Sequence, residues 1–192
     1  KTYSLRSLAD FKTKILEQDF TSMLLEINGQ EVYTPISGNF NAYNLTAVYG
    51  SMIEMGIEEC EALIAISKAK GAEGRLDWMK NSKNQVGVVD YAHTPDALEN
   101  ILKAIKSMNT TGGNIITVVG CGGNRDKEKR PKMAQIACEL SERVILTSDN
   151  PRNEEPETIL EEMEMGVPIH KKLNVLTITD RKNAIKTACS LA

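Results

Sequence analysis

Four adjacent residues, Asp149, Asn150, Pro151 and Arg152, form the most informative pattern in this chain of 192 residues. They follow an apolar run at residues 144–148 that is typical of a buried strand, and ligands of open α/β sheets bind at the carboxyl ends of strands. Arg152 could hold a carboxylate through two parallel hydrogen bonds, while Asp149 and Asn150 could accept hydrogen bonds from an ammonium group. The pattern suits a zwitterionic ligand, although a strand-to-helix turn with capping residues would also explain it.

A second polar loop, at residues 120–131, follows another apolar run. Its glycines resemble a dinucleotide-binding loop, but the G-x-G-x-x-G pattern requires glycine where Arg125 stands, which argues against a redox cofactor. A solvated charged loop would explain residues 127–129, but it explains Arg125 less well because Arg125 is closest to the strand end. Glycines followed by four cations instead favour a concave, positive loop suited to carboxylates or phosphates. These cations are Arg125, Lys127, Lys129 and Arg130.

Asp90 and His93 belong to a third polar segment, D-Y-A-H-T-P-D at residues 90–96. Thr94 and Pro95 are explained as the N-cap and first-turn residue of a following helix. A helix start requires neither Asp90 nor His93, and a ribose hydroxyl or a nucleotide phosphate would give both a ligand to bind.

A fourth cluster, G-N-F-N-A-Y-N at residues 38–44, opens a long helical pattern. Asn41 and Asn44 are three residues apart, so their amides share one face of the first turn and could contact a nucleotide there. Asn39 could serve as an N-cap, and a purely structural role would explain the segment as well.

Composition limits the class of protein. A hydrophobic content of 41% is ordinary for a globular chain with a packed core. The net charge of −3 and the pI of about 5.6 argue against a general nucleic-acid binder. Four cysteines without C-x-x-C spacing and two histidines favour a reducing cytoplasm over a zinc site or disulfide framework. Neither a signal peptide nor a membrane span is predicted.

The elements that position the fourth cluster follow from periodicity in the first 74 residues. The turn pair Asn28-Gly29 between apolar runs predicts a hairpin, and two helices are predicted after it. On the first helix, we predict that Tyr43, Ala47, Val48 and Met52 share one face. The predicted strands are 11–20, 22–27 and 31–36, and the predicted helices are 40–55 and 57–69.

From residue 86 onward, short apolar strands alternate with amphipathic helices. This alternation predicts a parallel sheet covered on both faces, in a doubly wound, Rossmann-like α/β domain. The polar loops that follow the first three strands should converge at one edge of the sheet. Gly71 and Gly74 bracket the expected domain boundary, which separates residues 1–74 from 75–192. The predicted strands are 86–89, 115–119, 144–147 and 175–178, and the helices are 95–107, 131–140, 156–165 and 181–191.

Taken in order, these motifs closely resemble the Mur ligase family, from about residue 2 to the end of the chain. The resemblance implies that residues 1–74 are the α/β tail end of the central ATP-binding domain. Residues 75–192 would be most of the Rossmann-like, amino-acid-binding C-terminal domain, truncated at its end. The motifs are G-N-F-N-A-Y-N, G-R at Gly74 and Arg75, D-Y-A-H-T-P-D, G-C-G-G-N-R-D-K-x-K-R-P and D-N-P-R.

The resemblance also implies an activity, an ATP-dependent amide-bond ligase of peptidoglycan precursor synthesis that works through an acyl phosphate. Within the family, the motifs look most like those of ligases that add meso-diaminopimelate to UDP-N-acetylmuramoyl-L-alanyl-D-glutamate. The implied cofactors are ATP and Mg²⁺, bound mainly by parts of the enzyme outside these residues. The expected protein is a cytoplasmic monomer that binds neither nucleic acid nor membrane.

Carried over position by position, the resemblance implies that Arg152 recognises the second carboxylate, which distinguishes diaminopimelate from lysine. His93 is added to the predicted nucleotide-binding residues because a helix start does not require it. The predicted nucleotide-binding residues are Asn41, Asn44, Arg75, Asp90 and His93, and the predicted diaminopimelate-binding residues are Arg125, Asp149, Asn150, Pro151 and Arg152.

The chain also departs from the family pattern. It has no G-x-x-x-x-G-K-[ST] phosphate loop, and Leu76 and Asp77 follow Arg75 where the family more often has an aromatic residue or Met and then Glu. The family's G-K-G-H-E segment would lie beyond Ala192, so the chain is expected to be an inactive fragment, and no catalytic or metal-binding residue is assigned. A ligase that joins glutamate to folate and a non-catalytic amino-acid-binding module are the alternatives, and a nicotinamide dehydrogenase is disfavoured.

Overall fold

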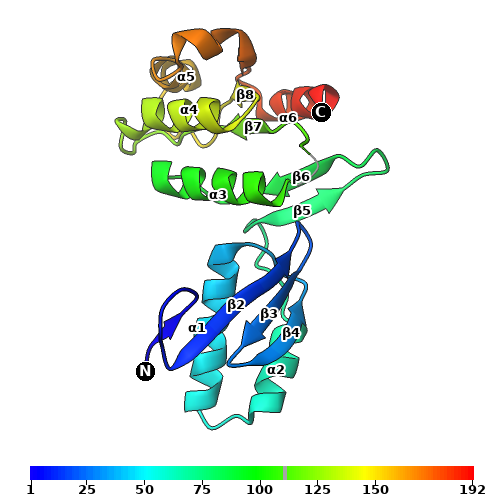
Figure 1. Cartoon of the computed structure of the whole chain (residues 1–192). Helices are drawn as coiled ribbons and strands as arrows, with labels where there is room; N and C mark the ends of the chain where they lie inside the picture. The colour runs from blue at the N-terminus through cyan, green and yellow to red at the C-terminus, as the bar shows by residue number, and fades with distance from the viewer. Residues whose placement is uncertain (110–111) are drawn as a thin grey trace. The chain divides into compact units, whose positions relative to one another are not determined.

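The computed structural model describes residues 1–109 and 112–192. The chain divides into two units, Lys1–Tyr91 and Ala92–Ala192, and each unit buries its own set of apolar side chains. Figure 1 shows the order of their helices and strands. The domain boundary expected after residue 74 stays a prediction.

The first unit contains a sheet with the strand order β1-β2-β3-β4, in which only β1 and β2 run parallel. Asn28 and Gly29 both have positive φ angles, 47° and 87°, so the predicted hairpin between β3 and β4 is confirmed. Helices α1 and α2 follow, and α1 packs on β2 while α2 packs on β4. The elements are β1 (Tyr3–Ser4), β2 (Phe11–Gln18), β3 (Met23–Ile27), β4 (Gln30–Thr34), α1 (Asn39–Glu54) and α2 (Glu59–Ser67).

The face of α1 that packs on the sheet differs from the predicted one. Tyr43 and Val48 are 42% and 50% exposed, while Met52 packs against the core, so only part of the predicted face is buried. Beside Ala42, Leu45 and Tyr49, the helix buries Thr46 and Gly50, which hydrophobic periodicity does not mark. The Thr46 hydroxyl donates to the Thr13 hydroxyl oxygen at 2.8 Å. Gly50 admits the Phe11 ring, because an added Cβ would lie 2.6 Å from a ring carbon.

Tyr49 joins the two helices of the first unit. Its ring packs edge-on against Phe11 with 5.9 Å between centroids, and its hydroxyl donates to Glu59 of α2 at 2.8 Å. Burial, together with the Glu59 hydrogen bond, raises the pKa of Tyr49 to about 12. The phenol therefore stays protonated at neutral pH and keeps its role as a donor.

Strand β6 (Val86–Val89) has a partner that the sequence pattern did not indicate. It pairs antiparallel with β5 (Asp77–Lys80) in a two-stranded sheet, so its predicted place in the parallel sheet is wrong. The reason is local turn chemistry, because the Asn81 side chain accepts hydrogen bonds from the backbone N–H groups of Lys83 and Gln85 at 2.9 and 3.1 Å. This side-chain turn closes a hairpin that strand periodicity alone does not mark.

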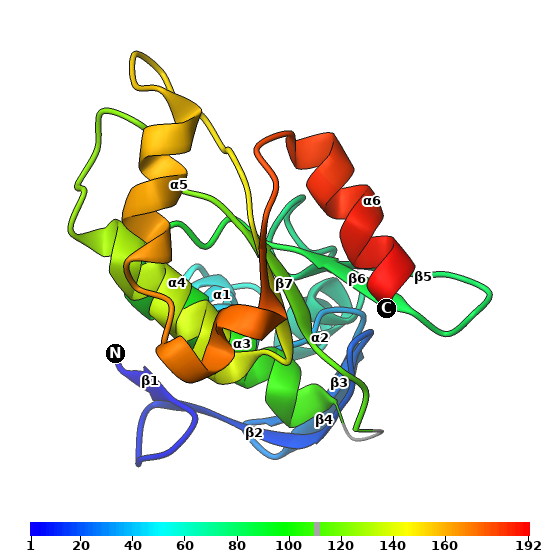
Figure 2. The same ribbon diagram turned by 90° about the horizontal axis from the view of Figure 1, so that it is seen from above.

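The second unit has a three-stranded parallel sheet of order β7-β8-β9, which confirms the predicted mixed α/β fold with a parallel sheet. Figure 2 shows α4 and α5 on one side of the strands and α6 on the other. The elements are α3 (Pro95–Met108), β7 (Ile116–Val119), α4 (Lys129–Leu140), β8 (Arg143–Leu146), α5 (Pro156–Glu164), a 3-10 helix η1 (Ile169–Asn174), β9 (Val175–Thr177) and α6 (Arg181–Leu191).

The central strand of this sheet forms the middle of the second core. Val144, Ile145 and Leu146 of β8 are at most 1% exposed, so the strand is buried on both faces as predicted for a parallel sheet. The predicted start of α3 is also confirmed, because the Thr94 hydroxyl oxygen accepts from the Ala97 N–H at 3.3 Å. Among the described helices, none combines the length and apolar character needed to cross a membrane.

Candidate functional site

Two loops meet at the carboxyl end of the parallel sheet. We call residues 120–128, after β7, the glycine loop, and Asp149–Arg152, after β8, the DNPR turn. The Gly123 N–H donates to the Asn150 carbonyl at 2.8 Å, and the Arg152 Nη1 donates to the Gly123 carbonyl at 2.9 Å. The predicted convergence of these two loops is therefore confirmed.

The glycines allow this close approach between the loops. A Cβ added at Gly123 would lie 1.9 Å from the Pro151 carbonyl oxygen, and one added at Gly120 would lie 2.3 Å from the Thr147 carbonyl oxygen. Both obstacles are backbone atoms, so any larger residue would separate the loops. A Cβ at Gly122 would instead lie 2.8 Å from Arg152 Nη1, the far end of a flexible side chain.

Arg152 has an uncommon backbone conformation, with a φ of 52°. A long side chain seldom adopts this left-handed region, and such residues cluster at binding sites. Its Nη1 donates to the carbonyls of Gly123 and Asn150 at 2.9 and 3.4 Å. Within the described residues, its Nε and Nη2 donate to no protein acceptor. The guanidinium is thus anchored by one nitrogen and keeps donors for a ligand.

Arg125 is the cation of the glycine loop that the protein leaves without a partner within its described part. It is exposed, and no acidic side chain pairs with it there. Lys129 donates from Nζ to the His93 carbonyl at 2.8 Å, and Lys127 lies 3.3 Å from Glu154. The prediction that four cations form one positive loop is therefore wrong for Lys127, whose charge is paired, and stays a prediction for Lys129, whose partner is a neutral carbonyl.

Arg130 gives the clearest correction, because its side chain is fully buried. Its Nη1 bonds Glu154 at 3.0 Å and Glu162 at 2.5 Å, and its Nη2 bonds Glu154 at 3.0 Å and the Gly122 carbonyl at 3.3 Å. Sequence reasoning missed both glutamates, since they lie 24 and 32 residues further along the chain. Arg130 is committed to these partners and is not available to a ligand.

Glu154 is the acidic centre of this network. Its carboxylate accepts from the Arg130 guanidinium, from the Asn124 N–H and from Lys127. The Arg130 hydrogen bond, followed by that of Asn124, lowers the pKa of Glu154 to about 2. The same pairing raises the pKa of Arg130. The Glu154 carboxylate and the Arg130 guanidinium are therefore both ionised at neutral pH.

The remaining DNPR residues are placed as follows. Asp149 lies 3.7 Å from the Arg181 guanidinium at the start of α6, so its carboxylate already has a cationic neighbour. The carbonyl of Pro151 accepts from the Glu154 N–H at 3.0 Å. Asn150 and Asp149 are exposed, so their side-chain oxygens remain accessible to a ligand.

Cys121 lies in the glycine loop, but its thiol is not available for nucleophilic chemistry. It is 2% exposed and contacts the Met133 sulfur at 3.6 Å. Burial raises the pKa of the Cys121 thiol to about 11, so the thiol is protonated at neutral pH. The chemistry of this loop therefore rests on its arginine and its backbone.

The first unit brings part of the predicted nucleotide-binding set together at the start of α1. Gly38, with a φ of 96°, precedes the helix, and Asn39 is the first helical residue, so its possible role as an N-cap is wrong. The Asn41 amide donates to the Ser37 carbonyl at 2.7 Å and is partly committed to the backbone. Asn44 is exposed.

Arg75 and Asp90 connect to the same region through Leu76. A Cβ added at Gly38 would lie 3.0 Å from the buried Leu76 side chain, whose N–H donates to Asp90 at 2.8 Å. The Arg75 guanidinium lies 4.7 Å from the centre of the Tyr91 ring, which sequence reasoning had not selected. The structure thus joins Arg75 and Asp90 to the helix start, whereas His93 belongs to the second unit.

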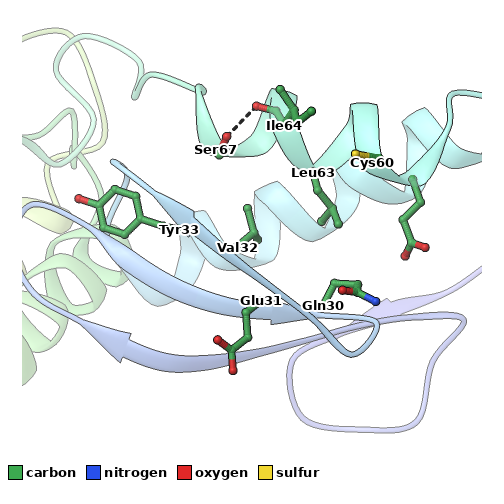
Figure 3. Close-up of a pocket in the computed structure, with 9 residues that line it drawn as sticks. Gln30, Glu31, Val32, Tyr33, Cys60, Leu63, Ile64 and Ser67 are labelled. Atoms are coloured by element: carbon green, nitrogen blue, oxygen red, sulfur yellow. Dashed lines mark hydrogen bonds between the residues drawn. The ribbon is translucent and has the colours of Figure 1, made fainter.

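A hollow and the possible metal ligands were also compared with the predicted site residues. A hollow of about 690 Å³ opens between β4 and α2, where Val32, Tyr33, Leu63 and Ile64 line it (Figure 3). None of the predicted site residues lines this hollow. Within residues 1–109 and 112–192, no three His, Cys, Asp or Glu side chains are grouped as metal ligands, so Mg²⁺ is assigned to no residue.

Comparison with known proteins places these loops in a family. The chain is 53% identical over 191 residues to UDP-N-acetylmuramoyl-L-alanyl-D-glutamate–2,6-diaminopimelate ligase from Phocaeicola vulgatus. It is 40% identical over 195 residues to the ligase of the same name from Clostridioides difficile. Each match covers 100% of this chain and 40% of the relative, so the chain spans about two fifths of these curated relatives.

Solved structures give the same grouping. A ligase of that name matches with a TM-score of 0.65 and 35% identity, over 99% of this chain and 39% of that chain. Folylpolyglutamate synthase from Thermotoga maritima matches with a TM-score of 0.74 and 19% identity, over 93% of this chain and 41% of that chain, which shows a shared fold alone. Residues 74–192 match the family described as the Mur ligase, glutamate ligase domain. The chain therefore belongs to the Mur ligase family.

Proposed function

We propose that this chain is the part of an ATP-dependent ligase that binds the incoming amino acid. The complete enzyme would join meso-diaminopimelate to UDP-N-acetylmuramoyl-L-alanyl-D-glutamate in cytoplasmic peptidoglycan precursor synthesis. The observation that carries the proposal is the pair Arg125 and Arg152, whose loops meet at one sheet edge and which keep donors that no group among the described residues uses. Relatives named as diaminopimelate ligases at up to 53% identity support it.

In this proposal, the DNPR turn holds the amino acid by complementary charge. The free nitrogens of Arg152 would bind a carboxylate as a planar fork, and Arg125 would neutralise a further carboxylate charge. Asp149 and Asn150 offer exposed oxygens to an ammonium group. Lysine lacks the second carboxylate and would leave a guanidinium without a partner, so the site would discriminate against it.

The nucleotide is assigned to the first unit. We infer that Asn41 and Asn44 contact it at the start of α1, and that Arg75 and Asp90 approach it from the segment around Leu76. His93, which belongs to the second unit, stays a predicted nucleotide-binding residue. Bound ATP with Mg²⁺ would supply the phosphoryl group that activates the substrate carboxylate. The ligase is proposed to act as a monomer without nucleic-acid or membrane partners.

The test is phosphate release by the complete ligase that carries this chain, with meso-diaminopimelate or L-lysine as the amino acid. Arg152→Ala should raise the KM for diaminopimelate by an amount equivalent to about 2 to 5 kcal/mol, and Arg152→Lys should restore little. The matched control is Arg143→Ala, an exposed arginine at the start of β8, away from the DNPR turn. This control should leave the KM for diaminopimelate unchanged.

Other outcomes would point elsewhere. Turnover with a folate and glutamate, but not with diaminopimelate, would indicate the folate-type ligase. Binding of diaminopimelate without phosphate release would indicate a non-catalytic binding module. Equal use of lysine and diaminopimelate would remove the specificity assigned to Arg152.

A further inference from the structure

Arg130 lies in an unfavourable place for a cation that only stabilises the fold. It is the second residue of α4, where the helix dipole disfavours positive charge, and its side chain is fully buried. Its Nε has no hydrogen-bond partner within the described chain. Buried ion pairs also cost desolvation, and apolar replacements of similar volume are often at least as stable. Stability alone therefore gives a weak reason for an arginine here.

Its contacts instead fix the position of the two ligand loops. Nη2 donates to the Gly122 carbonyl at 3.3 Å, and the next carbonyl, that of Gly123, accepts from Arg152. On the other side, the fork of Arg130 grips Glu154, whose own N–H donates to the Pro151 carbonyl. One guanidinium thus contacts both the glycine loop and Glu154, two residues after the DNPR turn.

Glu154 completes the connection from the acidic side. Besides Arg130, its carboxylate accepts from the Asn124 N–H in the glycine loop. The Asn124 side chain in turn accepts from the Asn153 N–H at 3.1 Å. Glu162, on α5, also pairs with Arg130 and lies 3.5 Å from Lys127 of the glycine loop, but within the described residues it bonds no backbone group of either loop. The two glutamates therefore share Arg130 and Lys127 as partners and differ in whether they bond the backbone of the glycine loop.

We propose that Arg130, acting through Glu154, is a positioning residue that fixes the DNPR turn against the glycine loop and so sets the geometry of the amino-acid site. This inference rests on the proposed function. A lysine cannot replace the arginine, because one ammonium cannot bond both oxygens of Glu154 and the Gly122 carbonyl in the same planar arrangement. The residue acts on substrate binding without touching the substrate.

The experiment compares four variants of the complete ligase: Arg130→Lys, Glu154→Gln, Glu162→Gln and Lys127→Ala. Lys127 is a matched control, since it pairs with the same two glutamates but is 59% exposed. For each variant, the KM for meso-diaminopimelate, the KM for ATP, kcat and the unfolding temperature are measured. Loss of folded enzyme lowers the apparent kcat and leaves the KM unchanged, so the KM separates positioning from stability.

We expect Arg130→Lys and Glu154→Gln to raise the KM for meso-diaminopimelate at least about tenfold, with the KM for ATP within about twofold. Glu162→Gln and Lys127→Ala should leave both KM values near wild type. Should Arg130→Lys fail to fold, Glu154→Gln, which keeps the size of the side chain, carries the test.

Three results would overturn the inference. Unchanged KM values for diaminopimelate in Arg130→Lys and Glu154→Gln, in an active enzyme, would remove it and leave the proposed function intact. An equal rise in Glu162→Gln would assign the effect to the ion pair in general and not to the loops. Wild-type enzyme that makes no product with diaminopimelate would instead overturn the proposed function, and this inference with it.

Discussion

In the second unit, the glycine loop and the DNPR turn contact each other through backbone atoms, whereas the candidate nucleotide residues of the first unit are joined through side chains. Gly123 bonds the Asn150 carbonyl directly, but Asp90 reaches Leu76 with its carboxylate. The first arrangement depends on the absence of a Cβ, and the second depends on particular functional groups. The two candidate sites should therefore respond to different substitutions.

The two regions also differ in how their cations are held. In the second unit, Arg130 and Lys127 share two glutamates, and Arg152 is anchored by backbone carbonyls. In the first unit, Arg75 lies over the Tyr91 ring. An aromatic partner satisfies fewer of the guanidinium donors than carboxylates do, so we expect the arginine of the first unit to reorient more readily on binding a ligand.

The largest expected effect is that of Gly123→Ala in the second unit. The new Cβ would meet the Pro151 carbonyl oxygen at 1.9 Å, and backbone must move to accommodate it. We expect a loss of about 3 kcal/mol in the free energy of unfolding of that unit, measured by thermal unfolding of the chain. The control is Gly122→Ala, which displaces only the end of the Arg152 side chain. If both substitutions cost the same, backbone contact between the loops is not what holds the site.

A smaller effect is expected for Asp90→Ala in the first unit. It removes the carboxylate that accepts from the Leu76 N–H, and a hydrogen bond to a charged group contributes about 1.5 to 3 kcal/mol. Amide exchange of Leu76 should accelerate, while the sheet of the second unit stays protected. Asp90→Asn retains an acceptor oxygen and serves as the control. An unchanged exchange rate in Asp90→Ala would show that side-chain contacts do not hold this region.

The sequence was sufficient to predict that the glycine loop and the DNPR turn would meet, for a local reason. Both follow parallel strands with clear apolar runs, and neighbouring parallel strands end at the same edge. Thr94 and the Asn28-Gly29 turn were predictable because capping and turn chemistry depend on a few adjacent residues. These features required no knowledge of distant contacts.

The features of the fold and the site that the sequence did not predict depend on distant or polar partners. Arg130 looked like a member of a positive loop because its partner Glu154 lies 24 residues away. On α1, the buried face includes Thr46, whose hydroxyl is satisfied by Thr13 of β2. Periodicity counts such residues as polar and cannot see their partners. Strand β6 was assigned to the wrong sheet because the Asn81 turn, not the apolar run, decides its pairing.

The smallest expected effect is the loss of stability of each unit as the pH falls below neutral. The pKa of Glu154 falls from its usual 4.5 to about 2 in the folded chain, so its contribution to stability is present above pH 4.5 and is lost as the pH falls towards 2. In the first unit, hydrogen bonds led by that of the Thr21 side chain also lower the pKa of Asp19, so acid should weaken both units. Glu154→Gln should remove the acid dependence of the second unit only. Amide exchange between pH 6 and pH 3 would measure the two units separately, with β3 reporting on the first unit and β7 on the second. If the exchange of β7 in Glu154→Gln rose as steeply with acid as in the wild type, Glu154 would not be the group that responds.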